Sequence, residues 1–220
     1  MENRSAASPQ LQQLRHTIRT WWYDTTTTRS VCYFLIAWHL IIWLLPLDVT
    51  ESTVEYWLLA TANPSPGWML AAFSHAGLAH LLTNTGLLIM FGATIERQLS
   101  TRQYLVFLLA TGILTTLAQV LEYNLHNVMG AMVGASGASF AVTAFTLVTL
   151  YRTSPSDYTL EHTSTINYRP GKSLAALVLI VGQLINDWTP YLSIAPKASG
   201  IGHLTGILLG ALTAILTAKT

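Results

Sequence analysis

A serine flanked by glycines and a distant histidine are the residues of this sequence best suited to chemistry. Ser136 lies within Gly134-Ala135-Ser136-Gly137, and His203 is the only histidine of the last apolar segment. A serine hydroxyl becomes a good nucleophile when a base takes its proton, and imidazole exchanges protons near neutral pH. Glycines beside the serine leave room for a substrate backbone. These residues indicate hydrolysis by a serine nucleophile, provided that the fold brings them together.

The composition places both residues in a membrane protein. Of 220 residues, 51% are apolar and only 10% are charged, whereas about 25% are charged in soluble domains. Cys32 is the only cysteine, which excludes an internal disulfide and a metal site with two cysteines. We therefore expect a polytopic membrane protein without disulfides.

Six apolar segments predict an all-α membrane protein with six transmembrane helices. They are residues 31–47, 78–95, 104–121, 136–151, 173–184 or slightly beyond, and 201–218. The first 30 residues, which are basic and aromatic, predict a short segment on the cytoplasmic membrane surface. The predicted organisation is this segment, 1–30, followed by a six-helix membrane domain, 31–218.

Basic residues fix the expected orientation because they favour the cytoplasmic side. With the N-terminus inside, ten of the eleven lysines and arginines lie on the inner side and only Lys197 lies outside. The outer loops then carry acidic residues, Asp187 among them. We expect a multi-pass protein of the cell membrane with both termini in the cytoplasm.

Helix geometry gives Ser136 and His203 the same depth. Ser136 lies sixteen residues before Arg152, and His203 lies sixteen residues before Lys219. At 1.5 Å per residue, each is about 24 Å from the inner boundary, a few Å below the outer surface. The two side chains can therefore meet within the membrane.

A pair of hydrogen-bond donors on the second predicted helix lies near this level. His80 and Asn84 are seventeen and thirteen residues before Arg97, or about 26 and 20 Å from the inner boundary. Their four-residue spacing places them on one helix face. Both can donate hydrogen bonds to an oxyanion, a role that suits them better than that of nucleophile.

The segment before Ser136 and the glycines after His203 predict how the pair is positioned. We expect a loop from Glu122 to Val133 that dips back and delivers Ser136 to the first turn of a helix, where free amides favour an oxyanion. Gly202, Gly206 and Gly210 recur every four residues. This face predicts close approach to the small residues of the fourth helix, Ser136, Ala138 and Ser139. Alone, the glycines around Ser136 favour helix packing over chemistry, because small residues are common wherever membrane helices touch. The alternative for the second pattern is a glycine zipper in which His203 bonds to a carbonyl, but an intramembrane histidine is more often functional.

Metal binding is the main chemical alternative. His75, His80 and His203 could hold zinc, but the sequence has no His-Glu-x-x-His motif and no acidic residue is expected at their level. We therefore expect neither a metal nor a cofactor. The same reasoning leaves no carboxylate to orient His203, so a Ser-His dyad is predicted, with Phe140 as the positioning contact.

In these motifs the chain resembles the rhomboid intramembrane serine proteases, over about residues 70 to 212. The residues that carry the resemblance are Gly134 to Gly137, His203 with Gly206 and Gly210, His80 with Asn84, His75, Gly92, Glu96, and Phe140. The resemblance implies that Ser136 is the nucleophile and His203 the general base. It also implies that His80 and Asn84 bind the oxyanion.

The resemblance further implies the substrates and the route to the site. Expected substrates are transmembrane proteins whose helix unwinds near the outer face, because an intact helix hides its carbonyls. The fifth helix and residues 188–200 are the expected cover of the site. One departure is the absence of the family's Trp-Arg pair between Asp48 and Phe73, where only Trp57 and Trp68 remain to seat the loop.

The expected partners are therefore transmembrane substrate proteins and the lipid bilayer, with no nucleic acid; the oligomeric state is left open. Two other functions compete with proteolysis. One is a catalytically inactive rhomboid-like protein that binds membrane clients. The other is a small polytopic transporter with a polar path at the level of Ser136. Transporters commonly contain inverted repeats, and no convincing internal repeat occurs in this sequence.

Overall fold

The computed structural model describes residues 24–44, 51–152, 169–188 and 200–217, together with a few isolated positions before residue 24. Its elements are α2 (Thr26–Leu44), α3 (Glu51–Leu58), β1 (Ala60–Thr61), α4 (Gly67–Leu70), α5 (Leu78–Glu96), α6 (Thr101–His126), β2 (Ala131–Met132), α7 (Ser136–Arg152), α8 (Arg169–Trp188) and α9 (Gly200–Thr217). Most of the predicted segment 1–30 and of the predicted cover 188–200 lies outside the described residues.

The prediction of an all-α, multi-pass membrane protein is confirmed. Four of the described helices, α2, α5, α6 and α9, are long and apolar enough to cross a membrane. The other two long helices are α7, which has 17 residues, and α8, which carries polar residues at both ends. The count of six spans and the cytoplasmic termini stay predictions.

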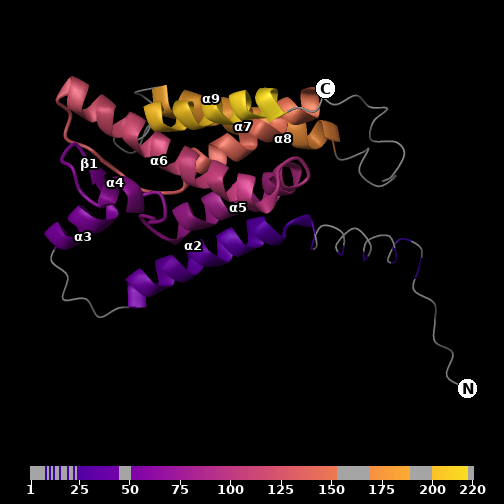
Figure 1. Cartoon of the computed structure of the whole chain (residues 1–220), viewed down its shortest axis with the longest axis horizontal. Helices are drawn as coiled ribbons and strands as arrows, with labels where there is room; N and C mark the ends of the chain where they lie inside the picture. Colours follow the sequence, from indigo (N-terminus) through magenta and orange to yellow (C-terminus); the bar gives the residue numbers. More distant parts are fainter. Residues whose placement is uncertain are drawn as a thin grey trace, which may run out of the picture.

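Helix α7 lies at the centre of the bundle. It packs against α5, α6, α8 and α9, and nearly all of its residues from Ser136 to Leu150 are buried. A helix surrounded by protein need not match the thickness of the lipid, which explains why the helix of Ser136 is short. Helix α2 packs against α5 at the edge of the bundle (Figure 1).

Helix α6 is longer than the predicted span 104–121. It begins after Ser100, whose side chain accepts from the amide of Gln103 while the Gln103 side chain accepts from the amide of Ser100. It ends at His126, after which Asn127 adopts a left-handed conformation with φ 51°. The predicted loop from Glu122 to Val133 is therefore wrong in its first part. Polar residues there resemble a loop in sequence, but Tyr123 is buried and the helix continues past it.

Short elements hold the chain that leads into α7. Strand β2 pairs antiparallel with β1, with Met132 opposite Ala60. The indole N–H of Trp68 in α4 donates to the carbonyl of Thr61 at 2.9 Å, which fixes β1 against α4. The amide of Gly134 then donates to the carbonyl of Ala71 at 2.8 Å. The approach to Ser136 is thus anchored by backbone hydrogen bonds.

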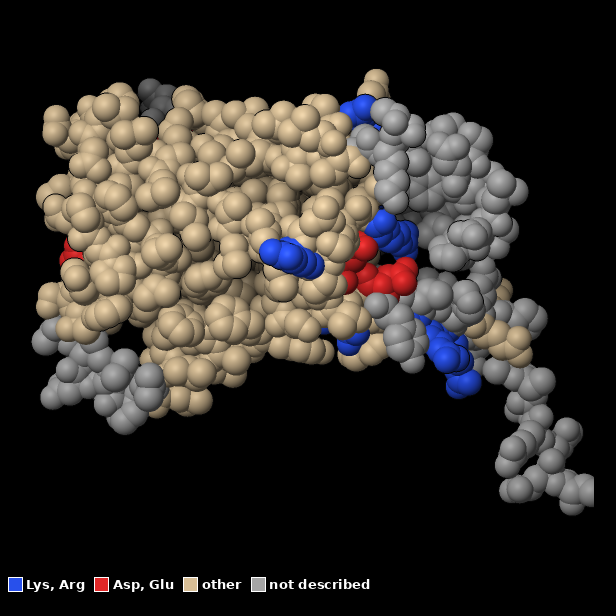
Figure 2. Space-filling model, viewed as in Figure 1, with Lys and Arg blue, Asp and Glu red and all other residues tan. Residues whose placement is uncertain are grey.

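The two ends of the bundle differ in charge. In Figure 1 the long helices run along the long axis of the view, and α3, α4 and β1 gather at one end. Lys and Arg side chains gather toward the opposite end (Figure 2). There α5 ends next to Arg97, α7 ends at Arg152 and α8 begins with Lys172 in its first turn. Ser136, at the start of α7, lies away from this basic end.

Candidate active site

Ser136 is the first residue of α7, and the chain makes a tight approach to it. Gly134 has φ 117°, a backbone conformation that residues other than glycine rarely adopt. A Cβ atom on Gly134 would lie 2.4 Å from Cε1 of His80. Glycine is therefore required at this position for two reasons, and it lets the segment before Ser136 lie directly against α5.

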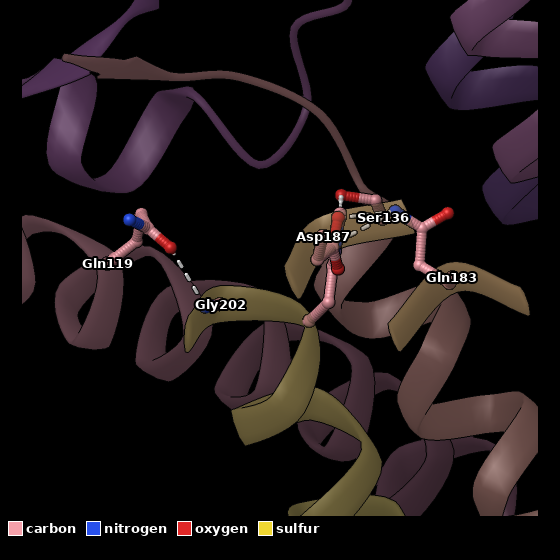
Figure 3. Close-up of polar contacts among 6 residues, drawn as sticks. Gln119, Ser136, Gln183, Asp187 and Gly202 are labelled. Atoms are coloured by element: carbon pink, nitrogen blue, oxygen red, sulfur yellow. Dashed lines mark hydrogen bonds and ion pairs between the residues drawn. The ribbon is translucent and has the colours of Figure 1, made fainter. Parts of the chain in front are cut away.

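His203 lies in the first turn of α9, and α6 fixes the start of that helix. The amide of Gly202 donates to Oε1 of Gln119 at 3.0 Å (Figure 3). Gln119 is fully buried, and its amide nitrogen in turn donates to the Glu122 carboxylate. Because a free amide at a helix start needs an acceptor, this contact holds His203 in place through its neighbour.

The glycines of α9 allow the close approach that their spacing predicts. A Cβ on Gly206 would lie 2.2 Å from the carbonyl oxygen of Gly137, and one on Gly210 would lie 2.0 Å from that of Ala141. Gly202 instead faces Met132 and the carbonyl of Thr115 on α6. The contacts on α7 are therefore made by the backbone of Gly137 and Ala141, and not by the small side chains expected, Ser136, Ala138 and Ser139.

The structure brings the two predicted chemical residues together. Oγ of Ser136 lies 2.9 Å from Nε2 of His203, and both side chains are buried. The ring of Phe140, one turn below Ser136, lies 5.1 Å from the imidazole centroid at an interplanar angle of 58°. Phe140 thus contacts His203 as expected, although the rings are tilted and not stacked.

The expectation that no carboxylate lies at the level of His203 is wrong. Oδ2 of Asp187 lies 2.8 Å from Nδ1 of His203, whose other ring nitrogen contacts Ser136 (Figure 3). The sequence predicts Asp187 in an outer loop because the apolar segment fades after Leu184. Helix α8 instead continues to Trp188 and carries Asp187 in its last turn.

A sequence signal for this carboxylate existed in α8. Gln183 and Asp187 are four residues apart, so they share a helix face, and Nε2 of Gln183 donates to Oδ1 of Asp187 at 2.8 Å. A polar pair at this spacing next to an apolar segment indicates a helix that continues, with its polar side chains facing the protein.

His80 and Asn84, the predicted oxyanion ligands, lie against Gly134, two residues before Ser136. Both project from α5 toward Gly134, and a Cβ there would lie 2.7 Å from Nε2 of His80 and 3.5 Å from Nδ2 of Asn84. Nδ2 of Asn84 is buried and has no hydrogen-bond partner among the described residues. A buried donor without an acceptor lowers the stability of the fold unless a ligand accepts its hydrogen bond. A free donor at this place favours a negatively charged substrate atom as its acceptor.

His75 supports the segment from the other side. It lies between α4 and α5, where burial and the neighbouring His80 lower the pKa of His75 to about 4. The ring is therefore neutral, and its Nε2 accepts from the amide of Ala135 at 3.5 Å while Nδ1 donates to the carbonyl of Phe73 at 3.2 Å. His75 binds the backbone next to Ser136 and leaves the hydroxyl to His203.

The arrangement has the parts needed for acyl transfer. A nucleophile and a base are in hydrogen-bond contact, a carboxylate lies behind the base, and donors lie across from the serine. Within the described part of the chain, no three side chains that commonly ligate metals converge on one point.

Comparison with known proteins identifies the family of the chain. The family model of the Rhomboid domain matches residues 53–220, well over half of the chain. No curated protein sequence matches the chain significantly. The matched region contains every element from α4 to α9, and the resemblance found in the sequence motifs is confirmed. The chain therefore belongs to the rhomboid family, the intramembrane proteases that its motifs resemble.

Proposed function

We propose that this rhomboid-family chain is a serine endopeptidase that hydrolyses peptide bonds of transmembrane substrates. The hydrogen bond of 2.9 Å between Oγ of Ser136 and Nε2 of His203 carries the proposal. Both groups are buried, Ser136 at the start of α7 and His203 in the first turn of α9. A nucleophile and a base held at this distance inside an apolar bundle serve proteolysis directly, whereas client binding alone does not need them.

The proposed reaction is a two-step acyl transfer. His203 takes the hydroxyl proton of Ser136 while Oγ attacks the peptide carbonyl. The oxyanion is stabilised by the amide of Ser136, which begins α7, and by the side chains of Asn84 and His80. His203 gives its proton to the leaving amine, and water then hydrolyses the acyl-enzyme by the same route. No cofactor takes part.

The proposed setting is the cell membrane, with six spans, cytoplasmic termini and a site near the outer face. The basic residues at the end of the bundle opposite Ser136 support this orientation. Substrates are transmembrane proteins with a helix that unwinds near this level, because the carbonyl of a regular helix is not accessible to a nucleophile.

A cleavage assay in proteoliposomes tests the proposal. The purified chain should cut a reporter that carries one transmembrane helix, and Ser136→Ala should lose this activity. Ser30→Ala serves as the matched control, since Ser30 is an exposed residue of α2. Equal cleavage by wild type and Ser136→Ala, or no cleavage of any of several reporters, would leave client binding or transport as the function.

A further inference from the structure

We propose that Asp187 is a positioning residue that completes a Ser136-His203-Asp187 triad, in place of the dyad that the family resemblance implies. This inference rests on the proposed function and concerns the same site. Oδ2 of Asp187 lies 2.8 Å from Nδ1 of His203, on the ring side away from Ser136. The three side chains come from three helices, α7, α9 and α8.

The contact between Asp187 and His203 is sheltered from solvent. The side chains of His203 and Asp187 are 10% and 7% exposed. A surface pair would contribute little, but a charge-assisted hydrogen bond in such surroundings is short and strongly directional. This bond therefore fixes the rotation of the imidazole as well as its position.

Asp187 also selects the tautomer of His203 that can act as a base. Two groups compete for Nδ1: the carboxylate of Asp187 at 2.8 Å, and the amide nitrogen of Gln183 at 3.3 Å. If Gln183 donated to Nδ1, the carboxylate would face a lone pair at close range, which is repulsive. The carboxylate therefore keeps the proton on Nδ1. Nε2 then presents its lone pair to Oγ of Ser136, as a general base must.

Gln183 supports the carboxylate and does not compete with it. Its Nε2 donates to Oδ1 of Asp187 at 2.8 Å. With the amide reversed, Oε1 would face Oδ1 and two acceptors would meet. Gln183 thus donates to Oδ1 of Asp187, and Oδ2 accepts from His203, so both carboxylate oxygens have a donor.

The proton balance of the step is simple. The hydroxyl proton of Ser136 moves to Nε2 as Oγ forms its bond to the carbonyl carbon, and His203 becomes an imidazolium. The proton on Nδ1 stays there, and Asp187 remains ionised throughout and stabilises the cation. The proton on Nε2 later leaves with the amine. No oxidant, reductant or second reactant is needed apart from water.

A purely structural role makes a different prediction. If the pair only tied α8 to α9, then removing the carboxylate would lower stability, raise KM through a looser site and leave kcat of the folded protein near normal. If Asp187 positions the base, kcat falls while KM changes little, because the base acts mainly in the transition state.

The experiment measures kcat and KM of four variants in proteoliposomes, with their thermal unfolding midpoints. Asp187→Asn keeps the shape of the side chain but lets its amide donate to Nδ1, which selects the wrong tautomer. We expect kcat to fall about 10³-fold with KM within about threefold of wild type. Asp187→Glu keeps the anion, and we expect a kcat about tenfold or more above that of Asp187→Asn.

Two further variants complete the set. Gln183→Ala, which frees Oδ1, should lower kcat by about tenfold. Asp24→Asn is the matched control, because Asp24 pairs with Arg97 at the basic end of the bundle. It should leave kcat unchanged.

The outcomes separate this inference from the proposed function. If wild type cleaves in a Ser136-dependent way and Asp187→Asn keeps kcat within about threefold, then the triad is overturned and the protease stands. If Asp187→Asn loses stability and Asp187→Glu recovers no turnover, the pair is structural and the triad is again overturned. If Ser136→Ala cleaves as well as wild type, the proposed function itself fails.

Discussion

Helix α5 carries a polar side chain toward each of its ends, the buried Asn84 and the half-buried Glu96, and the two differ in how they are satisfied. The carboxylate of Glu96 accepts three hydrogen bonds, from the amides of Thr27 and Thr28 at 3.0 and 2.6 Å and from the hydroxyl of Thr28 at 2.6 Å. Nδ2 of Asn84, in contrast, is buried, faces Gly134 and has no hydrogen-bond acceptor among the described residues. A complete network stabilises a fold, whereas an unused buried donor costs stability and is retained where a ligand binds.

This difference separates structural from catalytic residues on one helix. Changes near Asn84 should lower turnover and leave folding intact, and changes near Glu96 should do the reverse. Four substitutions, two of them in α5 and two in α9, test this division.

The largest effect is expected from His203→Ala. Loss of the base should lower kcat by at least about 10⁴-fold, because Ser136 then has no partner to take its proton. The comparison is made per folded molecule, because removal of the imidazole leaves the Asp187 carboxylate with Gln183 as its remaining donor and should lower the thermal midpoint. His126→Ala, at an exposed position at the end of α6, is the matched control. Turnover by His203→Ala within about tenfold of wild type would remove His203 as the base.

Asn84→Ala should lower kcat by about 10²- to 10³-fold, the usual cost of losing one oxyanion donor. Stability should stay the same or rise, since the deleted Nδ2 has no partner among the described residues. Asn124→Ala is the control, because Asn124 is exposed and donates to the carbonyls of Ala62 and Val120. A variant that unfolds without loss of kcat per folded molecule would assign Asn84 to the structural class.

Glu96→Gln should show the opposite pattern. The neutral amide turns one acceptor into a donor that faces the amide of Thr27 or Thr28, so we expect a loss of about 2 kcal/mol in the free energy of unfolding. Glu55→Gln, on the exposed face of α3, should change nothing. Both midpoints can be measured by thermal unfolding in detergent. If Glu96→Gln kept its midpoint and lost kcat, the division between the two ends of α5 would be wrong.

Gly206→Ala tests the packing that brings the base to the nucleophile. Its Cβ would lie 2.2 Å from the carbonyl oxygen of Gly137, so α9 must move, at a cost of about 1–3 kcal/mol. Gly86→Ala is the matched control, because nothing lies within 4 Å of its added Cβ. It should be neutral or slightly stabilising in a helix. Equal midpoints for the two variants would contradict the close contact of α9 with α7.

The sequence predicts this fold well where a single physical requirement dominates. Lipid demands long apolar helices, so α2, α5, α6 and α9 are each close to a predicted segment. The residues at which helices end are harder to predict from the sequence. The predicted end of α6 near Leu121 missed the buried Tyr123, because a polar residue that faces protein cannot be told from one in a loop by composition alone.

The candidate site was predictable in part for a related reason. Ser136, His203 and Asn84 share a depth that counting along helices reveals, and the structure places them around Gly134 and the start of α7. Asp187 was missed because its position depends on where α8 ends and how α8 packs on α9. Packing of that kind follows from tertiary contacts, which no local pattern of residues contains.

The adduct that a fluorophosphonate forms with the active protein identifies the nucleophile. After reaction in proteoliposomes, mass spectrometry of the digested chain should find the phosphonyl group on Ser136 in wild type. The His203→Ala variant should show almost none, because its serine is not activated. An adduct on another residue, or full cleavage activity without any adduct at Ser136, would contradict the account.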